Sequence, residues 1–97
     1  MASYKLTPLA RNQLLAIHRY TEENFGRAQA DKYHAGFHRI FSLIAKVPKM
    51  GRRADDFKPG YRRHLYQAHR IFYTVEDDCV AIRAIYHTSL DLPEASD

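Results

Sequence analysis

The 97-residue sequence predicts a two-layer α+β fold in which a helical hairpin packs on a mainly antiparallel sheet. From residue 8 to 46, apolar residues recur every three or four positions, as they do in amphipathic helices. From residue 61 to 87 the period falls to two, and β-branched and aromatic residues become frequent, as in strands. With a short strand before the helices, the order is β-α-α-β-β-β, and the length fits one domain over residues 1–97.

The first expected elements are a short strand and a helix that begins directly after it. Residues 4–7 (Tyr-Lys-Leu-Thr) alternate between apolar and polar side chains. Thr7 then offers a hydroxyl to the unpaired amides of the first helical turn, and Pro8 stands where no amide partner is needed. Gly26 is expected to end this helix in a left-handed conformation. The buried stripe is expected at Ala10, Leu14, Ile17 and Thr21.

A second amphipathic helix should follow within a few residues, which implies an antiparallel helical hairpin. Val47-Pro48 is expected to end it, because a residue before proline disfavours helical geometry. Its apolar stripe comprises Ala30, Tyr33, Phe37, Ile40, Phe41 and Ile44.

Residues 48–60, with proline and glycine near both ends, are expected to form a loop. Three strands should follow as a meander, at Tyr61–Tyr66, His69–Glu76 and Cys79–His87. Residues 88–97 are expected to form a turn and a loose tail. The helices would cover one face of this sheet, leaving the other face and its rim free for a partner.

The chain is basic, and its charge is unevenly distributed. Fifteen Lys and Arg against eleven Asp and Glu give +4, but three acidic residues lie in the last seven positions, so residues 1–90 carry +7 (15 − 8). Between Lys46 and Arg70, eight basic residues are opposed only by Asp55 and Asp56. Such a field attracts nucleic acid, an acidic protein or a nucleic-acid-handling enzyme, although a solvated loop would have the same composition.

Composition excludes several classes of protein. No apolar run is long enough for a membrane span and no signal peptide is evident, so a cytoplasmic location is expected. Cys79 is the only cysteine, which excludes an internal disulfide and a thiolate metal site. The four glycines form no phosphate-binding loop, and no cofactor is expected. His34 and His38 have metal-ligand spacing, but no third ligand is evident and no metal site is expected.

Basic and imidazole side chains on the predicted strands are the candidates for function. Pairing of neighbouring strands would bring Arg62-Arg63-His64 and His69-Arg70 together with Arg83 and Tyr86-His87 on one face. Such groups stabilise a transferring phosphate and move a proton in ribonucleases, whereas the structural interpretation is that they pack and hydrogen-bond. No carboxylate stands at an obvious general-base position, so recognition is favoured and no catalytic residue is assigned. The expected partner-binding residues are Arg52, Arg53, Arg62, Arg63, His69, Arg70, Arg83 and His87.

The order and spacing of several motifs resemble those of ParE toxins, the toxin half of type II toxin–antitoxin pairs. The similar segments are Tyr4-Lys5-Leu6-Thr7-Pro8-Leu9-Ala10, Leu14–Thr21, Gly26, Gln29-Ala30, Tyr33, Pro48, Gly51, Tyr61-Arg62, His69–Tyr73 and Ile82–Asp91. They cover residues 4–91, nearly the whole chain. Asn12 and Gln13 depart from the family pattern and are expected on the outer face of the first helix, where they would alter partner choice. Asp91 is expected to cap the terminal turn.

The resemblance implies a RelE/ParE-like fold for the single domain 1–97. It also implies a cytoplasmic bacterial toxin that inhibits DNA gyrase, blocks replication and is neutralised by a ParD-like antitoxin in a hetero-oligomer. No enzyme activity, cofactor, metal or membrane association is expected, and direct nucleic-acid binding is not required.

Two alternatives stay open at this point. A RelE-like, ribosome-dependent mRNA endonuclease would place Arg62, Arg63 and Arg83 on phosphate and use Tyr86 or His87 in proton transfer. An inactive relic would bind its antitoxin and have only a regulatory role.

Overall fold

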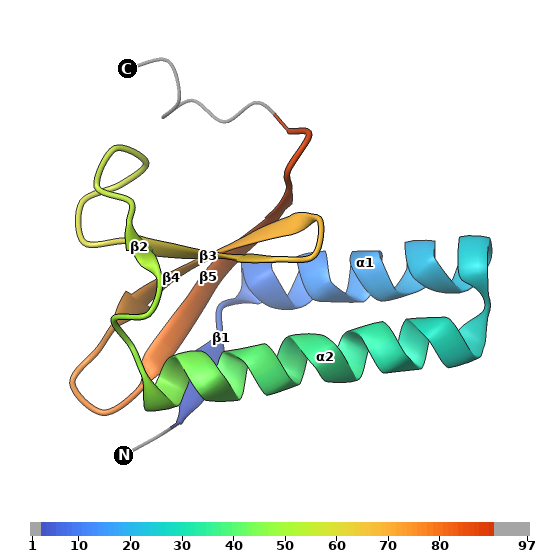
Figure 1. Cartoon of the computed structure of the whole chain (residues 1–97), viewed down its shortest axis with the longest axis horizontal. Coiled ribbons are helices and arrows are strands. Elements are labelled where there is room, and N and C mark those ends of the chain that lie inside the picture. The colour runs from blue at the N-terminus through green and yellow to red at the C-terminus, as the bar shows by residue number, and fades with distance from the viewer. Residues whose placement is uncertain (1–2, 91–97) are drawn as a thin grey trace.

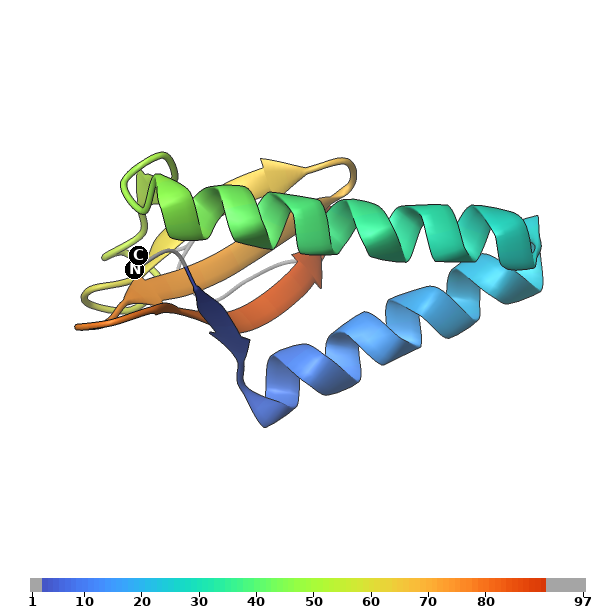
Figure 2. The same cartoon turned by 90° about the horizontal axis from the view of Figure 1, so that it is seen from below.

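The computed structural model of the protein describes residues 3–90, in which two helices lie on one side of a five-stranded sheet (Figures 1 and 2). The strand order is β1-β5-β4-β3-β2, with β1 parallel to β5 and every other pair antiparallel. This confirms the predicted α+β class and the helical hairpin on a mainly antiparallel sheet. The elements are β1 (Tyr4–Leu6), α1 (Pro8–Phe25), α2 (Arg27–Lys46), β2 (Arg52–Arg53), β3 (Arg62–Tyr66), β4 (His69–Val75) and β5 (Val80–His87).

Thr7 confirms the predicted helix start and also ties α1 to the sheet. Its Oγ1 accepts a hydrogen bond from the Ala10 amide at 3.2 Å, which satisfies one of the free donors of the first turn. The same hydroxyl donates to the carbonyl of Arg83 at 3.0 Å, and the Thr7 amide donates to the carbonyl of Ile82 at 3.0 Å. One residue therefore caps the helix and fixes its N-terminus against β5.

Gly26 is the only residue between the two helices, and it closes the hairpin at the end away from the sheet (Figure 1). Its φ of 92° and ψ of 165° lie outside the left-handed helical region that was expected, in a region that essentially only glycine adopts. Its amide still donates to the carbonyl of Glu22 at 2.9 Å, as in an ordinary helix end. The extended ψ of Gly26 reverses the chain direction within one residue, so α2 begins directly afterwards at Arg27.

The main core lies between the hairpin and the sheet. Burying each large apolar side chain there stabilises the fold by ~1.5–3 kcal/mol. Tyr4, Leu6, Ile17, Tyr33 and Ile40 pack at its margin. Its buried members are Ala10, Leu14, Phe37, Phe41, Ile44, Ile71, Tyr73, Val80, Ile82 and Ile85.

The opposite face of the sheet is only partly free, which corrects the expectation that it is open. Phe72 points away from the helices and is fully buried, because the ring of Phe57 stacks on it with centroids 4.3 Å apart. Tyr61 and Tyr86 pack around the same cluster. The 54–61 loop therefore covers part of this face, since an apolar ring left there by strand alternation must be shielded from water.

Two features of the sheet were not predicted. The expected loop 48–60 contains β2, a two-residue edge strand whose Arg52 and Arg53 pair with Arg63 and Arg62. The β4–β5 pairing shifts register between Phe72 and Tyr73. A two-residue strand is too short to show a hydrophobic period, and the register shift leaves no signal in the sequence. Both features are therefore set by how the strands pair and not by a local pattern.

Gln13 faces the sheet, which corrects its expected position on the outer face of α1. Its Oε1 accepts a hydrogen bond from the Ile85 amide at 2.6 Å. Asn12 is exposed as expected. Residues 91–97, including the expected cap Asp91, lie outside the described residues. Neither helix described by the structure has the length and apolar composition that crossing a membrane demands.

Candidate functional site

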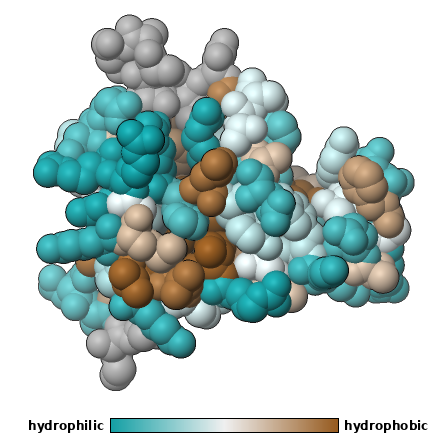
Figure 3. Space-filling view, in the orientation of Figure 1, coloured by the Kyte–Doolittle hydropathy of each residue, from teal (hydrophilic) through white to brown (hydrophobic). Residues whose placement is uncertain are grey.

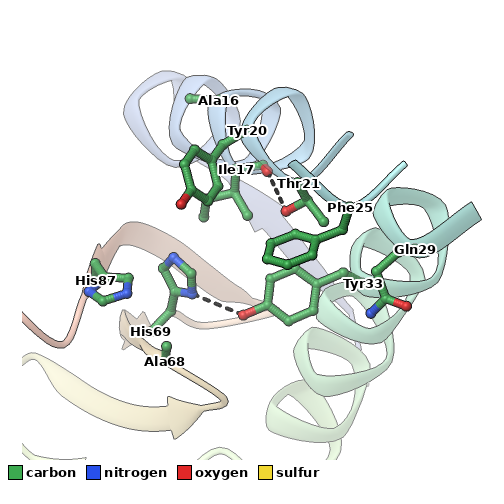
Figure 4. A pocket seen from close by; sticks show the side chains of 10 residues that line it. All are labelled: Ala16, Ile17, Tyr20, Thr21, Phe25, Gln29, Tyr33, Ala68, His69 and His87. Carbon is green, nitrogen blue, oxygen red and sulfur yellow. Dashed lines mark hydrogen bonds between the residues drawn. The ribbon is translucent and has the colours of Figure 1, made fainter. Parts of the chain in front are cut away.

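An apolar groove of about 810 Å³ lies on the helical side of the sheet, between the distal part of the hairpin and the β3–β4 turn (Figure 4). The helices supply most of its wall, and Ala68, His69 and His87 supply the part that belongs to the sheet. Figure 4 shows the aromatic rings and the two imidazoles arranged around one open space. The lining residues are Ala16, Ile17, Tyr20, Thr21, Phe25, Gln29, Tyr33, Ala68, His69 and His87.

His69 is the most constrained polar group of the apolar groove. Its Nδ1 lies 3.0 Å from the hydroxyl of Tyr33, and its ring lies edge-on to that of His87 with centroids 5.2 Å apart. Burial, and secondarily the neighbouring His87, lowers the pKa of His69 below its ordinary range. Burial, with a smaller contribution from Tyr66, raises the pKa of Tyr33. Both groups are therefore uncharged near neutral pH, which suits a surface that binds an apolar face.

Two aromatic side chains that line the apolar groove are exposed and therefore accessible to a partner. Tyr20 is 62% exposed and Phe25 67% exposed, although both belong to α1. Large exposed rings beside a concave apolar surface are typical of protein–protein contact sites. Sequence reasoning missed both residues because it searched the strands for charge. The available signal was that Tyr20 and Phe25 widen the apolar stripe of α1 beyond the width that one core contact needs.

A basic cleft of about 640 Å³ lies on the opposite face of the sheet. Arg52 and Arg63 are direct cross-strand partners, so their side chains project from the same face. Arg70 pairs with Leu65, two residues from Arg63, and therefore projects from that face as well. Hydrophilic groups crowd the side of the molecule that carries β2 (Figure 3). The cleft is lined by Met50, Arg52, Asp56, Arg63, His64, Leu65, Arg70 and Thr88.

The remaining predicted residues have local partners instead. The Arg62 guanidinium donates to the carbonyl of Gly51 at 2.7 Å, and Arg53 pairs with Asp55 at 2.7 Å. The carboxylate of Glu76 accepts a hydrogen bond from Arg83 at 3.0 Å. The same guanidinium donates to the hydroxyl of Thr74 at 3.0 Å.

The predicted convergence on one face is therefore wrong. His69 and His87 lie in the apolar groove, whereas Arg52, Arg63 and Arg70 lie in the basic cleft on the other side. The cause is strand alternation, which sends adjacent residues such as Arg62 and Arg63 to opposite faces. The assignment of all eight residues as partner contacts remains a prediction.

The i, i+4 histidines of α2 form an aromatic row. His34 and His38 lie with ring centroids 4.8 Å apart, and His38 Nδ1 is 2.6 Å from the hydroxyl of Tyr4. Burial, with His34 as a smaller cause, lowers the pKa of His38. Within residues 3–90, no three His, Cys, Asp or Glu side chains come together in a way that would hold a metal ion.

Comparison with known proteins gives the family. Residues 4–92 match the family described as ParE toxin of type II toxin-antitoxin system, parDE. Toxin ParE1 of Mycobacterium tuberculosis is 29% identical over 90 residues, which is 92% of each chain. Toxin ParE1 of Caulobacter vibrioides is 31% identical over 88 residues, which is 91% of this chain and 92% of the relative.

A solved structure described as a chromosomal ParDE TA system from P. aeruginosa contains a chain with the same fold. Its TM-score is 0.77 at 21% identity, with 90% of this chain and 96% of that chain covered. This confirms the RelE/ParE-like fold that the sequence motifs implied. The chain belongs to the ParE toxin family of type II toxin–antitoxin systems.

Proposed function

We propose that this ParE toxin inhibits DNA gyrase, blocks replication and is neutralised in the cytoplasm by a ParD-like antitoxin that binds in the apolar groove. The family match over residues 4–92 carries this proposal, because it takes in all seven elements of the fold. The matched chain of the P. aeruginosa ParDE system has the same fold, which supports an antitoxin as the partner.

The apolar groove supports a helical or extended protein segment as ligand. An amphipathic segment would place its apolar side chains on Ile17, Tyr20, Phe25 and Tyr33. The uncharged His69 would then accept or donate one hydrogen bond without the cost of burying an imidazolium. A segment of this kind orders on binding and covers a large surface.

The proposed action is non-catalytic. An endonuclease would need phosphate-binding and proton-transfer groups around one reacting atom. Here the Arg62 guanidinium donates a hydrogen bond to the Gly51 carbonyl, and the Arg83 guanidinium donates one to the Glu76 carboxylate. Tyr86 packs in the cluster on the far face, whereas His87 lines the apolar groove on the helical side. This separation favours binding over RNA cleavage.

A supercoiling and cleavage-complex assay tests the proposed target. Purified toxin is added to gyrase, relaxed plasmid and ATP, with and without a ParD-like antitoxin. We expect loss of supercoiling and accumulation of linear DNA, both reversed by the antitoxin. Unchanged supercoiling at high toxin excess would contradict gyrase inhibition. Ribosome-bound mRNA would then distinguish an endonuclease, which cleaves it, from an inactive relic, which does not.

Antitoxin binding is tested by removing the two exposed rings of the apolar groove. Tyr20→Ala with Phe25→Ala should weaken antitoxin binding by at least tenfold, since aromatic anchors dominate interface energies. The fold should persist because both side chains are mostly exposed. The matched control is Leu9→Ala with Leu15→Ala, two side chains of α1 that are about half exposed and lie outside the apolar groove. Equal affinities of the two double variants, measured by calorimetry, would overturn this placement.

A further inference from the structure

We propose that the antitoxin segment in the apolar groove carries a carboxylate, which accepts hydrogen bonds from the imidazole pair formed by His69 and His87. This inference rests on the proposed function and deepens it, because it names the chemistry that the groove selects in its partner. It is argued from the position of the two imidazoles, from the ring nitrogen of each that carries a proton, and from the charge of the chain.

The imidazole pair lies at one end of the apolar groove. His69 begins β4 and His87 ends β5, and the two residues are direct cross-strand partners, so their side chains project from the same face of the sheet. Their rings lie edge-on with centroids 5.2 Å apart. The hydroxyl of Tyr20 points toward this end, whereas the rings of Phe25 and Tyr33 line the neighbouring part (Figure 4). The groove therefore has a polar end beside its apolar rings.

The turn after β5 determines which nitrogen of His87 carries the proton. The backbone amide of Ser89 donates a hydrogen bond to His87 Nδ1 at 3.0 Å. Because an amide N–H can only donate, Nδ1 is an acceptor and has no proton. The single proton of the neutral ring is therefore on Nε2. The side chain of His87 is exposed, so this N–H donor is accessible to a ligand.

His69 carries its proton on Nε2 as well. Its Nδ1, at 3.0 Å, is the only hydrogen-bond partner of the Tyr33 hydroxyl within residues 3–90, so the hydroxyl donates and Nδ1 accepts. Nε2 has no hydrogen bond in the same part of the chain. It is also accessible, since His34 Nδ1 is the only buried side-chain nitrogen or oxygen without a partner among the described residues. Figure 4 shows it on the side of the ring that faces Tyr20.

Two adjacent N–H donors favour a carboxylate over other polar groups of a protein segment. A carboxylate has two acceptor oxygens and can bind both rings, and hydrogen bonds to an ionised acceptor are about twice as strong as neutral ones. A lysine ammonium would bring only donors to nitrogens that already donate. The net charge of +4 adds a general attraction for an acidic segment. The groove therefore fits apolar side chains followed by an aspartate or glutamate.

An NMR titration of the full chain tests this chemistry without the antitoxin. The probes are phenylbutyrate, which joins an apolar ring to a carboxylate, and phenylbutyramide, its neutral isostere. We expect phenylbutyrate to bind at least about fivefold more tightly, as the stronger charge-assisted hydrogen bonds require. Proton–nitrogen correlation spectra of the imidazoles should show Nε2–H in both rings, and the Nε2 signals of both should shift when phenylbutyrate binds.

A pair of double variants separates the Nε2 donors from the rest of the ring. His69→Asn with His87→Asn leaves a polar group near each Nδ1 position, beside Tyr33 and Ser89, but removes the donors. The matched control, His69→Gln with His87→Gln, places an amide N–H near each Nε2 position. The asparagine variant should lose the preference for phenylbutyrate and bind a ParD-like antitoxin at least tenfold more weakly, whereas the control should keep the preference. Circular dichroism verifies folding, and His87→Asn alone, at an exposed position, replaces the double variant if that does not fold.

Three results would overturn the inference: phenylbutyrate binding no tighter than phenylbutyramide, or not at all; a proton on Nδ1 of either ring; or equal behaviour of the asparagine and glutamine variants. Failure of the proposed function gives a different pattern. Gyrase inhibition and antitoxin binding that the asparagine variant leaves unchanged would refute the carboxylate contact alone. A preference for phenylbutyrate in a toxin that binds no antitoxin would keep the carboxylate site and remove its assigned partner.

Discussion

At the scale of single residues, the hydroxyl of Tyr73 anchors the loop that follows α2. It accepts a hydrogen bond from the Gly51 amide at 2.9 Å and donates one to the Pro48 carbonyl at 2.7 Å, with its ring fully buried in the main core. Burial raises the pKa of Tyr73, so the proton that it donates is retained. A Cβ at position 51 would lie 2.8 Å from the carbonyl oxygen of Arg63, so only glycine fits beside this hydroxyl.

Removing that hydroxyl should be costly. Tyr73→Phe leaves two backbone groups without their partner, and we expect the free energy of unfolding to fall by about 1–3 kcal/mol. Urea unfolding measures this change. Tyr61→Phe is the matched control, because the hydroxyl of Tyr61 has no hydrogen-bond partner within residues 3–90; it should change stability by less than about 0.5 kcal/mol. Equal losses in the two variants would show that the anchor is not needed.

At the scale of elements, α2 meets β3 at Gly36. The hydroxyl of Tyr66 lies against the helix backbone there, where a Cβ would overlap it. The ring of Tyr66 is held edge-on by Phe37, at a centroid distance of 5.0 Å, and stacks on Tyr33 at 5.9 Å. Glycine inside a helix costs about 1 kcal/mol relative to alanine, so its presence at position 36 is explained by this close approach.

A double-mutant cycle tests the close approach. Gly36→Ala should lower the free energy of unfolding by about 1 kcal/mol, since overpacking of about 1–3 kcal/mol exceeds the gain in helix propensity. In a Tyr66→Phe background the hydroxyl is absent, and the same substitution should become neutral or stabilising. Urea unfolding of the four proteins gives the coupling energy. A coupling near zero would contradict the contact.

At the scale of the whole molecule, buried imidazoles make stability depend on pH. The pKa values of His38, His64 and His69 are all lowered, chiefly by burial. Each is uncharged in the fold but regains an ordinary pKa of about 6.5 on unfolding. Below that pH the unfolded chain therefore binds more protons than the folded one, so stability falls as the pH drops through about 6.5.

The pH prediction concerns the range between about 7.5 and 5. The free energy of unfolding should fall over that range, and less steeply in a His38→Gln, His69→Gln double variant. The pKa values of Asp31, Asp55 and Glu76 are lowered, by the His18 side chain, the Gly60 amide and the Thr74 hydroxyl respectively. The stability that these carboxylates contribute is lost only as the pH falls below about 4. It is therefore separate from the loss caused by the histidines, which occurs at higher pH. Identical slopes in wild type and the double variant, from urea unfolding at each pH, would contradict the prediction.

Much of the fold could be predicted from the sequence because its causes are local. The Thr7-Pro8 helix start depends on neighbouring residues, and the three long strands begin within a residue of their expected positions. Strand β2 could not be predicted, because two residues show no period and pair only when β3 is in place. Gln13 was misplaced for a related reason, since its partner is the amide of Ile85, distant in sequence.

The candidate site was predicted less well than the fold. Sequence reasoning identified Arg63, Arg70, His69 and His87 as functional candidates on one face of the sheet, and it added Arg52 as a candidate in the adjoining loop. Register and alternation divide them between two faces. The apolar groove was not predicted. The wide apolar stripe of α1 indicates that some of its rings lie outside the core, but which rings these are is known only from the packing of the hairpin on the sheet.

The sequence by itself determined the family, the order of every element except β2 and the basic charge of the chain, because motifs, periodicity and composition are properties of residues near one another along the chain. Only the tertiary structure decided which side chains share a surface. The strand register, the register shift between Phe72 and Tyr73, and the loop that covers Phe72 all depend on long-range contacts. Their free energy comes from contacts between segments far apart in sequence, and no local pattern records such contacts.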